Sequence, residues 1–320
     1  MLLNGVYVIS EDPLVILGTP VWQIIPYLPK GTKSHIQVVL PWYRGNPRGL
    51  VKILYLHYKH TLKYKNIDLF WTTNTQAEEF RFRLLGLKAL FLSQNAFCSD
   101  FIFKPLSLEK EWDAIYVASL SPYKRIELLK GIDGLRIIAR NPDNGQEYLK
   151  SLGVTATLNE GWVKRKELCS IINQSYAGLA ISKVEGAMYA ATEYLLCGIP
   201  VISTPSKGGR DVWFTKNNHI LVEPDPKSIK NAIEQVKRGD FSQELIAQET
   251  REKMRGFREK YLNLLKQEFD LDISYDELFG GYGLYKRFVL VRNAKEFFQS
   301  YKNGRFERQD LKGTTVLDAA

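Results

Sequence analysis

The sequence predicts an α/β protein of two domains, the first with a small parallel sheet and the second doubly wound, with helices on the faces of its parallel sheet. Three observations support this prediction. The chain has 320 residues, more than one compact core usually holds. Short runs of β-forming residues alternate with helical stretches along most of the chain. Residues 103–112, FKPLSLEKEW, follow neither period, which is typical of a linker between two such blocks.

The first block predicts a small parallel sheet. Two helical stretches, residues 50–64 and 76–85, connect its strands. The strands expected here are residues 6–10, 35–40, 67–73 and 88–93.

The second block predicts a larger parallel sheet. Ser121-Pro122 and Asp225-Pro226 each place a side-chain acceptor before a proline, as at helix starts, and Gly198 ends a helix just before Pro200. Such a domain binds its ligands beyond the carboxyl ends of its strands. The strands expected here are residues 114–119, 135–139, 154–158, 177–181, 201–204 and 220–222.

Composition limits the class of protein. With 45% hydrophobic and 25% charged residues, the chain is expected to fold as a globular protein. Three cysteines without paired spacing favour a reducing cytosol over a disulfide framework. Neither a cleaved signal nor a transmembrane segment is expected. The net charge of +9 suits anionic partners, but it does not choose among a nucleotide, a nucleic acid and a membrane surface.

Residues 182–205 carry the most informative pattern, a strand end, a loop, a helix and another strand. Glu193 is the only charged residue between Ala187 and Gly198, in a helix that is otherwise almost entirely apolar. A buried carboxylate is costly unless donors reach it. Those donors are either a basic residue of the chain itself or the hydroxyls of a ligand, and the pattern leaves both alternatives open.

Glu185 lies eight residues earlier, in the loop before this helix. The loop, with Gly186, Ala187 and Met188, is expected to present N–H groups at the positive end of the helix, where phosphate binds. The segment thus offers two acceptors for hydroxyls and a site for an anion. A sugar nucleotide has this distribution of groups.

The spacing of Glu185 and Glu193, followed by Gly198-Ile199-Pro200-Val201, resembles the signature of the retaining GT-B glycosyltransferases of family 4 (glycosyl transferases group 1). In that family the pattern is E-G, six residues, E, four residues, G-x-P-V. The similarity extends over about residues 65–240. Its other parts are FLSQNAFCSDFIF (91–103), VASLSPYKR (117–125), KGGRDVW (207–213) and NNHILVEPDPKSIKNAI (217–233).

The resemblance implies a GT-B architecture of two Rossmann-like domains facing a cleft. The N-terminal domain, residues 1–106, would be a short acceptor-side domain, and residues 107–285 would bind the nucleotide sugar. Residues 286–320 would form a helix returning toward the N-terminal domain, followed by a frayed tail. Residues 284–301 mix basic and aromatic side chains, so a membrane contact is the alternative for this segment. The returning helix is preferred because protein would then cover four apolar side chains, Phe288, Val289, Val291 and Phe297.

The resemblance also assigns roles. Lys124 and Glu185 would be the catalytic residues, with Lys124 on the diphosphate and Glu185 on the donor sugar. Glu193 would accept hydrogen bonds from the ribose. The remaining donor-binding residues would be Arg125, Gly161, Trp162, Val163, Gly186, Ala187 and Met188.

One position departs from the family pattern. Ser119 stands where family members commonly carry a second arginine for the diphosphate. The residues that could supply the missing cation are Arg125, Lys183, Lys207 and Arg210.

The function expected from the resemblance is transfer of a hexose-type sugar, with retention, from a nucleotide-diphosphate sugar to a carbohydrate or lipid-linked acceptor, as in polysaccharide biosynthesis. No metal and no further cofactor is implied. The expected location is the cytoplasm, with peripheral contact at the inner face of the membrane as an option. The alternatives are a catalytically silent nucleotide-sugar-binding paralogue and a sugar-nucleotide epimerase of the same fold. A nucleic-acid partner is not expected, because no recognition motif accompanies the positive charge.

Overall fold

The computed structural model describes residues 5–19, 21–239, 241–290 and 293–302. The chain divides into two compact units. Among the described residues, the first unit combines those before Cys98 with those from 255 to 302, and the second spans Cys98–Met254. The predicted boundaries at residues 106 and 285 differ from this division. Residues 255–285 belong to the first unit because their apolar side chains pack on its sheet.

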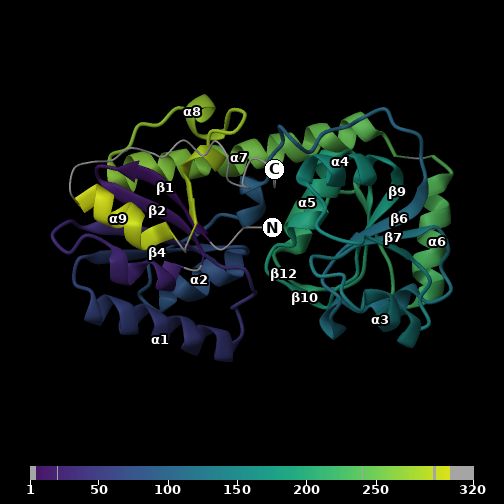
Figure 1. Cartoon of the computed structure of the whole chain (residues 1–320), viewed down its shortest axis with the longest axis horizontal. Helices are drawn as coiled ribbons and strands as arrows, with labels where there is room; N and C mark the ends of the chain where they lie inside the picture. The colour runs from purple at the N-terminus through teal and green to yellow at the C-terminus, as the bar shows by residue number, and fades with distance from the viewer. Residues whose placement is uncertain (1–4, 20, 240, 291–292, 303–320) are drawn as a thin grey trace. The chain divides into compact units, whose positions relative to one another are not determined.

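The sheet of the first unit has six strands in the order β14-β1-β2-β3-β4-β5. Three of them, β1, β2 and β4, are labelled in Figure 1. The predicted strands at β3, β4 and β5 are parallel, as expected. The first predicted strand, β1, instead runs antiparallel to β2 and β14, two strands that were not predicted. β2 is parallel to β3. Only two residues join β1 to β2, which suffices for a hairpin and not for a parallel crossover. The strands are β1 (Gly5–Glu11), β2 (Leu14–Thr19), β3 (Ser34–Val39), β4 (Ile67–Thr73), β5 (Ala89–Phe91) and β14 (Phe288–Leu290).

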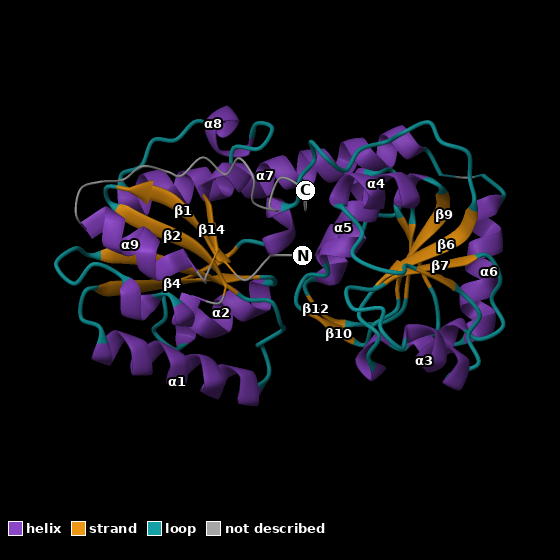
Figure 2. Ribbon diagram, in the orientation of Figure 1, coloured by secondary structure: helices purple, strands orange, loops and turns teal. Residues whose placement is uncertain are grey.

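Helices cover both faces of this sheet (Figure 2). On one face, Ile53, Phe82 and Phe298 of α1, α2 and α9 join one apolar cluster. On the other face, Tyr261 and Leu278 of α7 and α8 join a second cluster. The helices are α1 (Pro47–Lys63), α2 (Gln76–Leu84), α7 (Gln243–Phe269), α8 (Tyr275–Phe279) and α9 (Ala294–Lys302), with short 3-10 turns at η1 (Val21–Gln23), η2 (Ile25–Tyr27), η3 (Gln94–Phe97) and η7 (Tyr285–Arg287).

The helix boundaries follow local capping. Helix α1 begins at Pro47, earlier than predicted, because the side chain of Asn46 accepts the N–H of Gly49 at 2.8 Å. In the second unit, Asp225 caps α6 as predicted, by accepting the N–H of Ser228 at 2.9 Å. Ser121 occupies an N-cap position but makes no capping hydrogen bond. Its hydroxyl lies 2.8 Å from that of Ser119 instead.

The second unit contains the six predicted strands in one parallel sheet, ordered β13-β11-β9-β6-β7-β8. From β6 the chain moves to one side through β7 and β8, and then returns to build the other side through β9, β11 and β13. The order therefore reverses between β6 and β9, which is where doubly wound sheets bind ligands. The strands are β6 (Trp112–Val117), β7 (Leu135–Ile138), β8 (Thr157–Leu158), β9 (Ser175–Ala180), β11 (Val201–Ser203) and β13 (His219–Leu221).

A separate two-stranded ladder, β10 (Val184–Glu185) with β12 (Lys207–Gly208), lies in the loops after β9 and β11 (Figure 2). The other elements of this unit are α3 (Gly145–Ser151), α4 (Arg165–Asn173), α5 (Tyr189–Leu196), α6 (Pro226–Lys237), η4 (Pro122–Lys124), η5 (Ile126–Leu129) and η6 (Arg210–Trp213).

Candidate functional site

The reversal point of the second sheet holds a buried ion pair. Lys124 follows β6, Glu185 follows β9, and the Nζ of Lys124 contacts the Oε1 of Glu185. Their side chains are 10% and 9% exposed. Two residues far apart in the sequence are thus brought into direct contact by the crossover between neighbouring strands. Both are residues that the sequence predicts for the site.

The backbone around Lys124 is held by buried tyrosines. The hydroxyl of Tyr116 donates to the carbonyl of Lys124 at 2.9 Å, and the hydroxyl of Tyr194 accepts the N–H of Val117 at 2.6 Å. Burial raises the pKa of Tyr116 well above its ordinary value, and nearby Glu185 adds to the shift. Tyr116 therefore stays neutral and keeps the proton that it donates. Sequence patterns gave no signal for these two residues, since buried aromatic side chains usually serve packing alone.

Glu185 is positioned by the β10–β12 ladder. Glu185 pairs with Gly208, and the N–H of Gly209 donates to the carbonyl of Gly186 at 2.7 Å. Gly208 has φ of +120°, and a Cβ there would lie 1.7 Å from the carbonyl oxygen of Glu185. A side chain at position 208 is therefore incompatible with this backbone.

Arg210 fixes the same two loops from inside the protein. Its side chain is fully buried, and Nη1 and Nη2 donate to the carbonyls of Ala180 and Thr204, each at 2.6 Å. Nε donates to the carboxylate of Asp211 at 2.8 Å. The prediction that Arg210 is an alternative diphosphate cation is wrong, because these bonds occupy its donors. It instead joins the ends of β9 and β11.

Glu193 lies in α5 and is 5% exposed. Its carboxylate makes no ion pair and no side-chain hydrogen bond with any residue that the structure describes. The helix around it is buried over seven of its eight residues, all but Tyr189. The sequence left two kinds of donor open for Glu193, a basic residue of the chain or the hydroxyls of a ligand. No basic residue that the structure describes is that donor.

The first residue of α5 determines how far Glu185 and Glu193 lie from the start of the helix. The helix begins at Tyr189, and Met188 is its N-cap with φ of +56°. Ala187 and Met188 are both buried, and no side chain caps the helix start. Glu185 therefore precedes the helix by four residues, and Glu193 lies in its second turn.

Arg125 follows Lys124 with φ of +54°. Its Nη2 donates to the carbonyl of Pro205 at 3.2 Å, while its buried Nε has no hydrogen-bond partner. Burial, and then the nearby Arg210, lower the pKa of Arg125. The hydroxyls of Ser182 and Ser206 are also buried without a partner. Unsatisfied polar atoms thus collect in the loops that hold the ion pair, which is where a ligand or ordered water would satisfy them.

Gly161, Trp162 and Val163 lie in the loop after β8, at the same edge of the sheet. The side chain of Asn159 donates to the carbonyls of Gly161 and Ala139, at 2.6 and 2.8 Å, and so joins this loop to the end of β7. Trp162 is 49% exposed. Among the described residues, no side-chain hydrogen bond or ion pair joins this loop to Lys124, Glu185 or Glu193. Lys183 and Lys207 are exposed in the loops after β9 and β11.

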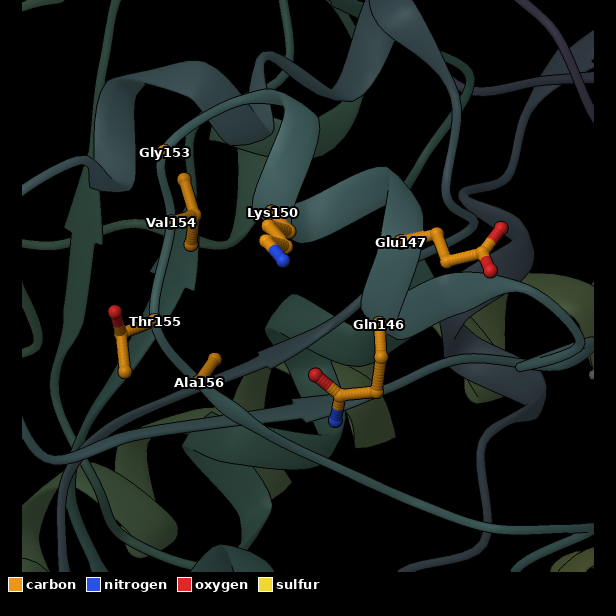
Figure 3. Close-up of a pocket in the computed structure, with 7 residues that line it drawn as sticks. All are labelled: Gln146, Glu147, Lys150, Gly153, Val154, Thr155 and Ala156. Carbon is orange, nitrogen blue, oxygen red and sulfur yellow. The ribbon is translucent and has the colours of Figure 1, made fainter.

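A surface pocket of about 460 Å³ lies elsewhere in this unit, between α3 and the segment leading to β8 (Figure 3). None of the predicted site residues lines it. Its lining residues are Gln146, Glu147, Lys150, Gly153, Val154, Thr155 and Ala156. The described residues contain no group of three or more potential metal ligands.

Residues 118–238 match the family described as Glycosyl transferases group 1, a range that includes Lys124, Glu185 and Glu193. No curated protein matches the chain.

Three solved structures share the fold at low sequence identity. Sucrose-phosphate synthase from Thermosynechococcus elongatus is similar with a TM-score of 0.55 and 14% identity, over 78% of this chain and 71% of that one. HepE from Anabaena, in complex with UDP, is similar with a TM-score of 0.53 and 13% identity, over 72% of each chain. The pneumococcal O-GlcNAc transferase GtfA, in complex with UDP and GlcNAc, is similar with a TM-score of 0.52 and 16% identity. The match covers 73% of this chain and 52% of that one. The chain therefore has the GT-B fold, and its residues 118–238 match the glycosyl transferases group 1 family.

Proposed function

We propose that this enzyme transfers a hexose-type sugar from a nucleotide-diphosphate sugar to a carbohydrate or lipid-linked acceptor, with retention of anomeric configuration. The observation that carries the proposal is Glu193, a residue only 5% exposed whose carboxylate makes no side-chain hydrogen bond or ion pair with a described residue. Burying such a group costs free energy that a structural role would have offset with a donor. The hydroxyls of a bound ribose are donors of the required kind.

The contact between Lys124 and Glu185 supports their proposed roles. In a nucleotide sugar, the distal phosphate is bonded directly to the sugar. Residues that bind these two groups are therefore expected to be neighbours, and the ion pair makes them so. On binding, Lys124 would turn to the phosphate, and Glu185 would accept hydrogen bonds from the sugar hydroxyls.

The remaining donor contacts surround this pair. The start of α5, with Gly186, Ala187 and Met188, would direct the positive end of the helix at the phosphates. Arg125 would add a second cation. The loop of Gly161, Trp162 and Val163 would bind the base, partly through backbone atoms.

The reaction needs stabilisation of the leaving diphosphate. As the anomeric bond breaks, negative charge grows on the phosphate oxygens, and the sugar gains oxocarbenium character. A preorganised cation such as Lys124 would lower this barrier by about 3 kcal/mol, or about a hundredfold in rate. The departing phosphate would accept the acceptor's proton on the same face of the sugar, so that no separate protein base is needed.

We further propose a uridine donor, because HepE and GtfA are each in complex with UDP. The acceptor would be bound by the first unit. Catalysis would need neither a metal nor another cofactor. The proposed setting is polysaccharide biosynthesis in the cytoplasm, at the inner face of the membrane.

The test is incubation of the full chain with UDP-, GDP-, ADP- and TDP-sugars, with and without oligosaccharide and lipid-linked acceptors. The expected result is acceptor-dependent release of UDP and an α-linked product from an α-linked donor, measured by NMR. Interconversion of the free donor without acceptor would instead identify an epimerase. Nucleotide binding without turnover would identify a silent paralogue.

A further inference from the structure

Helix α1 turns an apolar stripe toward solvent. Val51, Tyr55, Tyr58 and Leu62 are 68%, 60%, 50% and 64% exposed. At about 100° per residue, these four positions fall within an arc of about 60°, opposite Ile53, which is buried in the core. A helix on a water-soluble unit normally places polar residues on that side. The stripe is therefore an interaction surface and not a packing face of the unit.

A row of cations flanks the stripe along one side. Arg48, Lys52, Lys59 and Lys63 are all exposed, and the same helical geometry places them about 50 to 110° around from the centre of the stripe. The Nζ of Lys59 lies 5.4 Å from the ring centroid of Tyr55, so the two features adjoin. Helix α1 contains no Asp or Glu.

The charge imbalance extends beyond the helix. Residues 13–67 contain eight Lys and Arg and no acidic residue, in a chain whose net charge is +9. Lys30 and Lys33 are exposed in the loop before β3. Asn66, just after α1, donates to the carbonyl of Pro29 at 2.8 Å, which joins that loop to the C-terminal end of the helix. Most of the excess charge is thus gathered around α1.

Residues 284–301, for which a membrane contact was the alternative to packing on the N-terminal domain, pack on the first unit where the structure describes them. Phe288 is buried, β14 pairs with β1, and Ala294 and Phe298 of α9 are buried in the core of the first unit. Val291 and the side chain of Phe297 lie outside the described residues. No described helix is both long enough and apolar enough to cross a bilayer. A membrane contact therefore needs a different surface.

We propose that the outer face of α1, defined by Val51, Tyr55, Tyr58 and Leu62 with Arg48, Lys52, Lys59 and Lys63, docks on the surface of an anionic lipid bilayer. The helix would lie in the plane of the interface, with its apolar stripe at the acyl boundary and its cations among the headgroups. Tyrosines suit this depth because their rings are amphipathic. The absence of any acidic residue on α1 favours a uniformly anionic surface over a protein partner. This binding does not depend on the proposed transfer reaction.

The test is flotation of the full chain with phosphatidylcholine vesicles, with and without 30% phosphatidylglycerol. Wild type is expected to bind only the anionic vesicles, and 1 M salt should release it because the Debye length falls to about 3 Å. The double variant Lys52→Gln/Lys59→Gln should bind about 30-fold more weakly. The double variant Tyr55→Ser/Leu62→Ser should bind the anionic vesicles at least about tenfold more weakly than wild type.

Matched controls are the exposed pairs Lys166→Gln/Lys227→Gln and Leu221→Ser/Leu245→Ser in the second unit, which should bind as wild type. Circular dichroism checks that each variant folds, and a UDP-induced shift in Tm reports separately on the donor site. Absence of wild-type binding to anionic vesicles would overturn the proposal. Equal binding by wild type and the α1 variants, or a dimer in solution that the stripe variants abolish, would also overturn it.

Discussion

Lys124 and Glu185 are paired at the point where the second sheet reverses its strand order, although 61 residues separate them in the chain. Each side chain is about nine-tenths buried, so each charge depends mainly on the other for its interaction. The pair is the structural feature that most directly links the fold to the proposed reaction.

Breaking this pair is expected to affect stability and activity differently. Lys124→Met leaves the carboxylate of Glu185 buried and unpaired, which should lower the free energy of unfolding by about 3–5 kcal/mol. The double variant Lys124→Met/Glu185→Leu should regain most of that stability in urea denaturation. Both variants should retain at most about 1% of the transferase rate. A stable single variant, or a double variant with wild-type turnover, would argue against these roles.

Gly208→Ala is expected to be strongly destabilising, because the new Cβ would collide with the carbonyl oxygen of Glu185. The matched control is Gly239→Ala. Gly239 also has positive φ, +103°, but a Cβ at that position would have no atom within 4 Å. The control measures the backbone strain alone, on the order of 1 kcal/mol. Thermal unfolding should show a larger loss at 208, and an equal loss at both positions would contradict the close approach.

Arg210→Met is expected to leave the carbonyls of Ala180 and Thr204 without their donors. Because buried unsatisfied acceptors cost about 1–3 kcal/mol each, stability should fall by about 3 kcal/mol or more. Since those carbonyls belong to the loops around Glu185, donor affinity should fall as well. Arg140→Met, at an exposed position, is the control. Unchanged donor affinity in a folded Arg210→Met protein would remove Arg210 as a positioning residue.

Asp68 in the first unit gives a pH-dependent prediction. The hydrogen bond with His35, followed by Lys88, holds the pKa of Asp68 well below its ordinary value of 3.8. A lowered pKa in the folded state contributes stability above the unfolded-state pKa, and that contribution is lost as pH falls toward the folded pKa. Asp68→Asn should therefore lower Tm at pH 7 and have a smaller effect at pH 3. A Tm deficit of Asp68→Asn that is constant between these pH values would contradict the prediction. The control is Asp143→Asn, at an exposed position, which should lower Tm at neither pH.

The parallel sheet of the second unit could be predicted from the sequence because its strands and helices alternate with clear caps. All six predicted strands occur there, and residues 67–73 match β4 of the first unit fully. The antiparallel hairpin of β1 and β2 was missed, because an apolar run with Gly18 and Pro20 did not indicate a strand. The assignment of residues 255–302 to the first unit depends on long-range packing, which local periodicity does not report.

Within the site, the sequence identified the charged residues but not the residues that hold them in position. Glu193 stood out as a lone charge in an apolar helix, and its isolation in the structure agrees with that interpretation. The pairing of Lys124 with Glu185 depends on strand order, which no local motif encodes. Tyr116 and Tyr194 carried no signal, because an aromatic residue in a core is common without any function. Gly208 was found only as part of the segment KGGRDVW, and its close approach to Glu185 depends on the folded loops.

The most direct test of the account is the UDP-sugar-induced change in Tm of wild type and Glu193→Gln. Wild type should be stabilised by ligand. The variant should lose that shift and keep a ligand-free Tm close to that of wild type, because the Glu193 carboxylate makes no hydrogen bond or ion pair with a described residue that the substitution would break. Glu78→Gln serves as the control, since Glu78 is buried in the first unit and accepts hydrogen bonds from Arg44 and Thr75. It should lower the ligand-free Tm and keep the shift. Equal ligand-induced shifts in wild type and Glu193→Gln would contradict the proposed donor site.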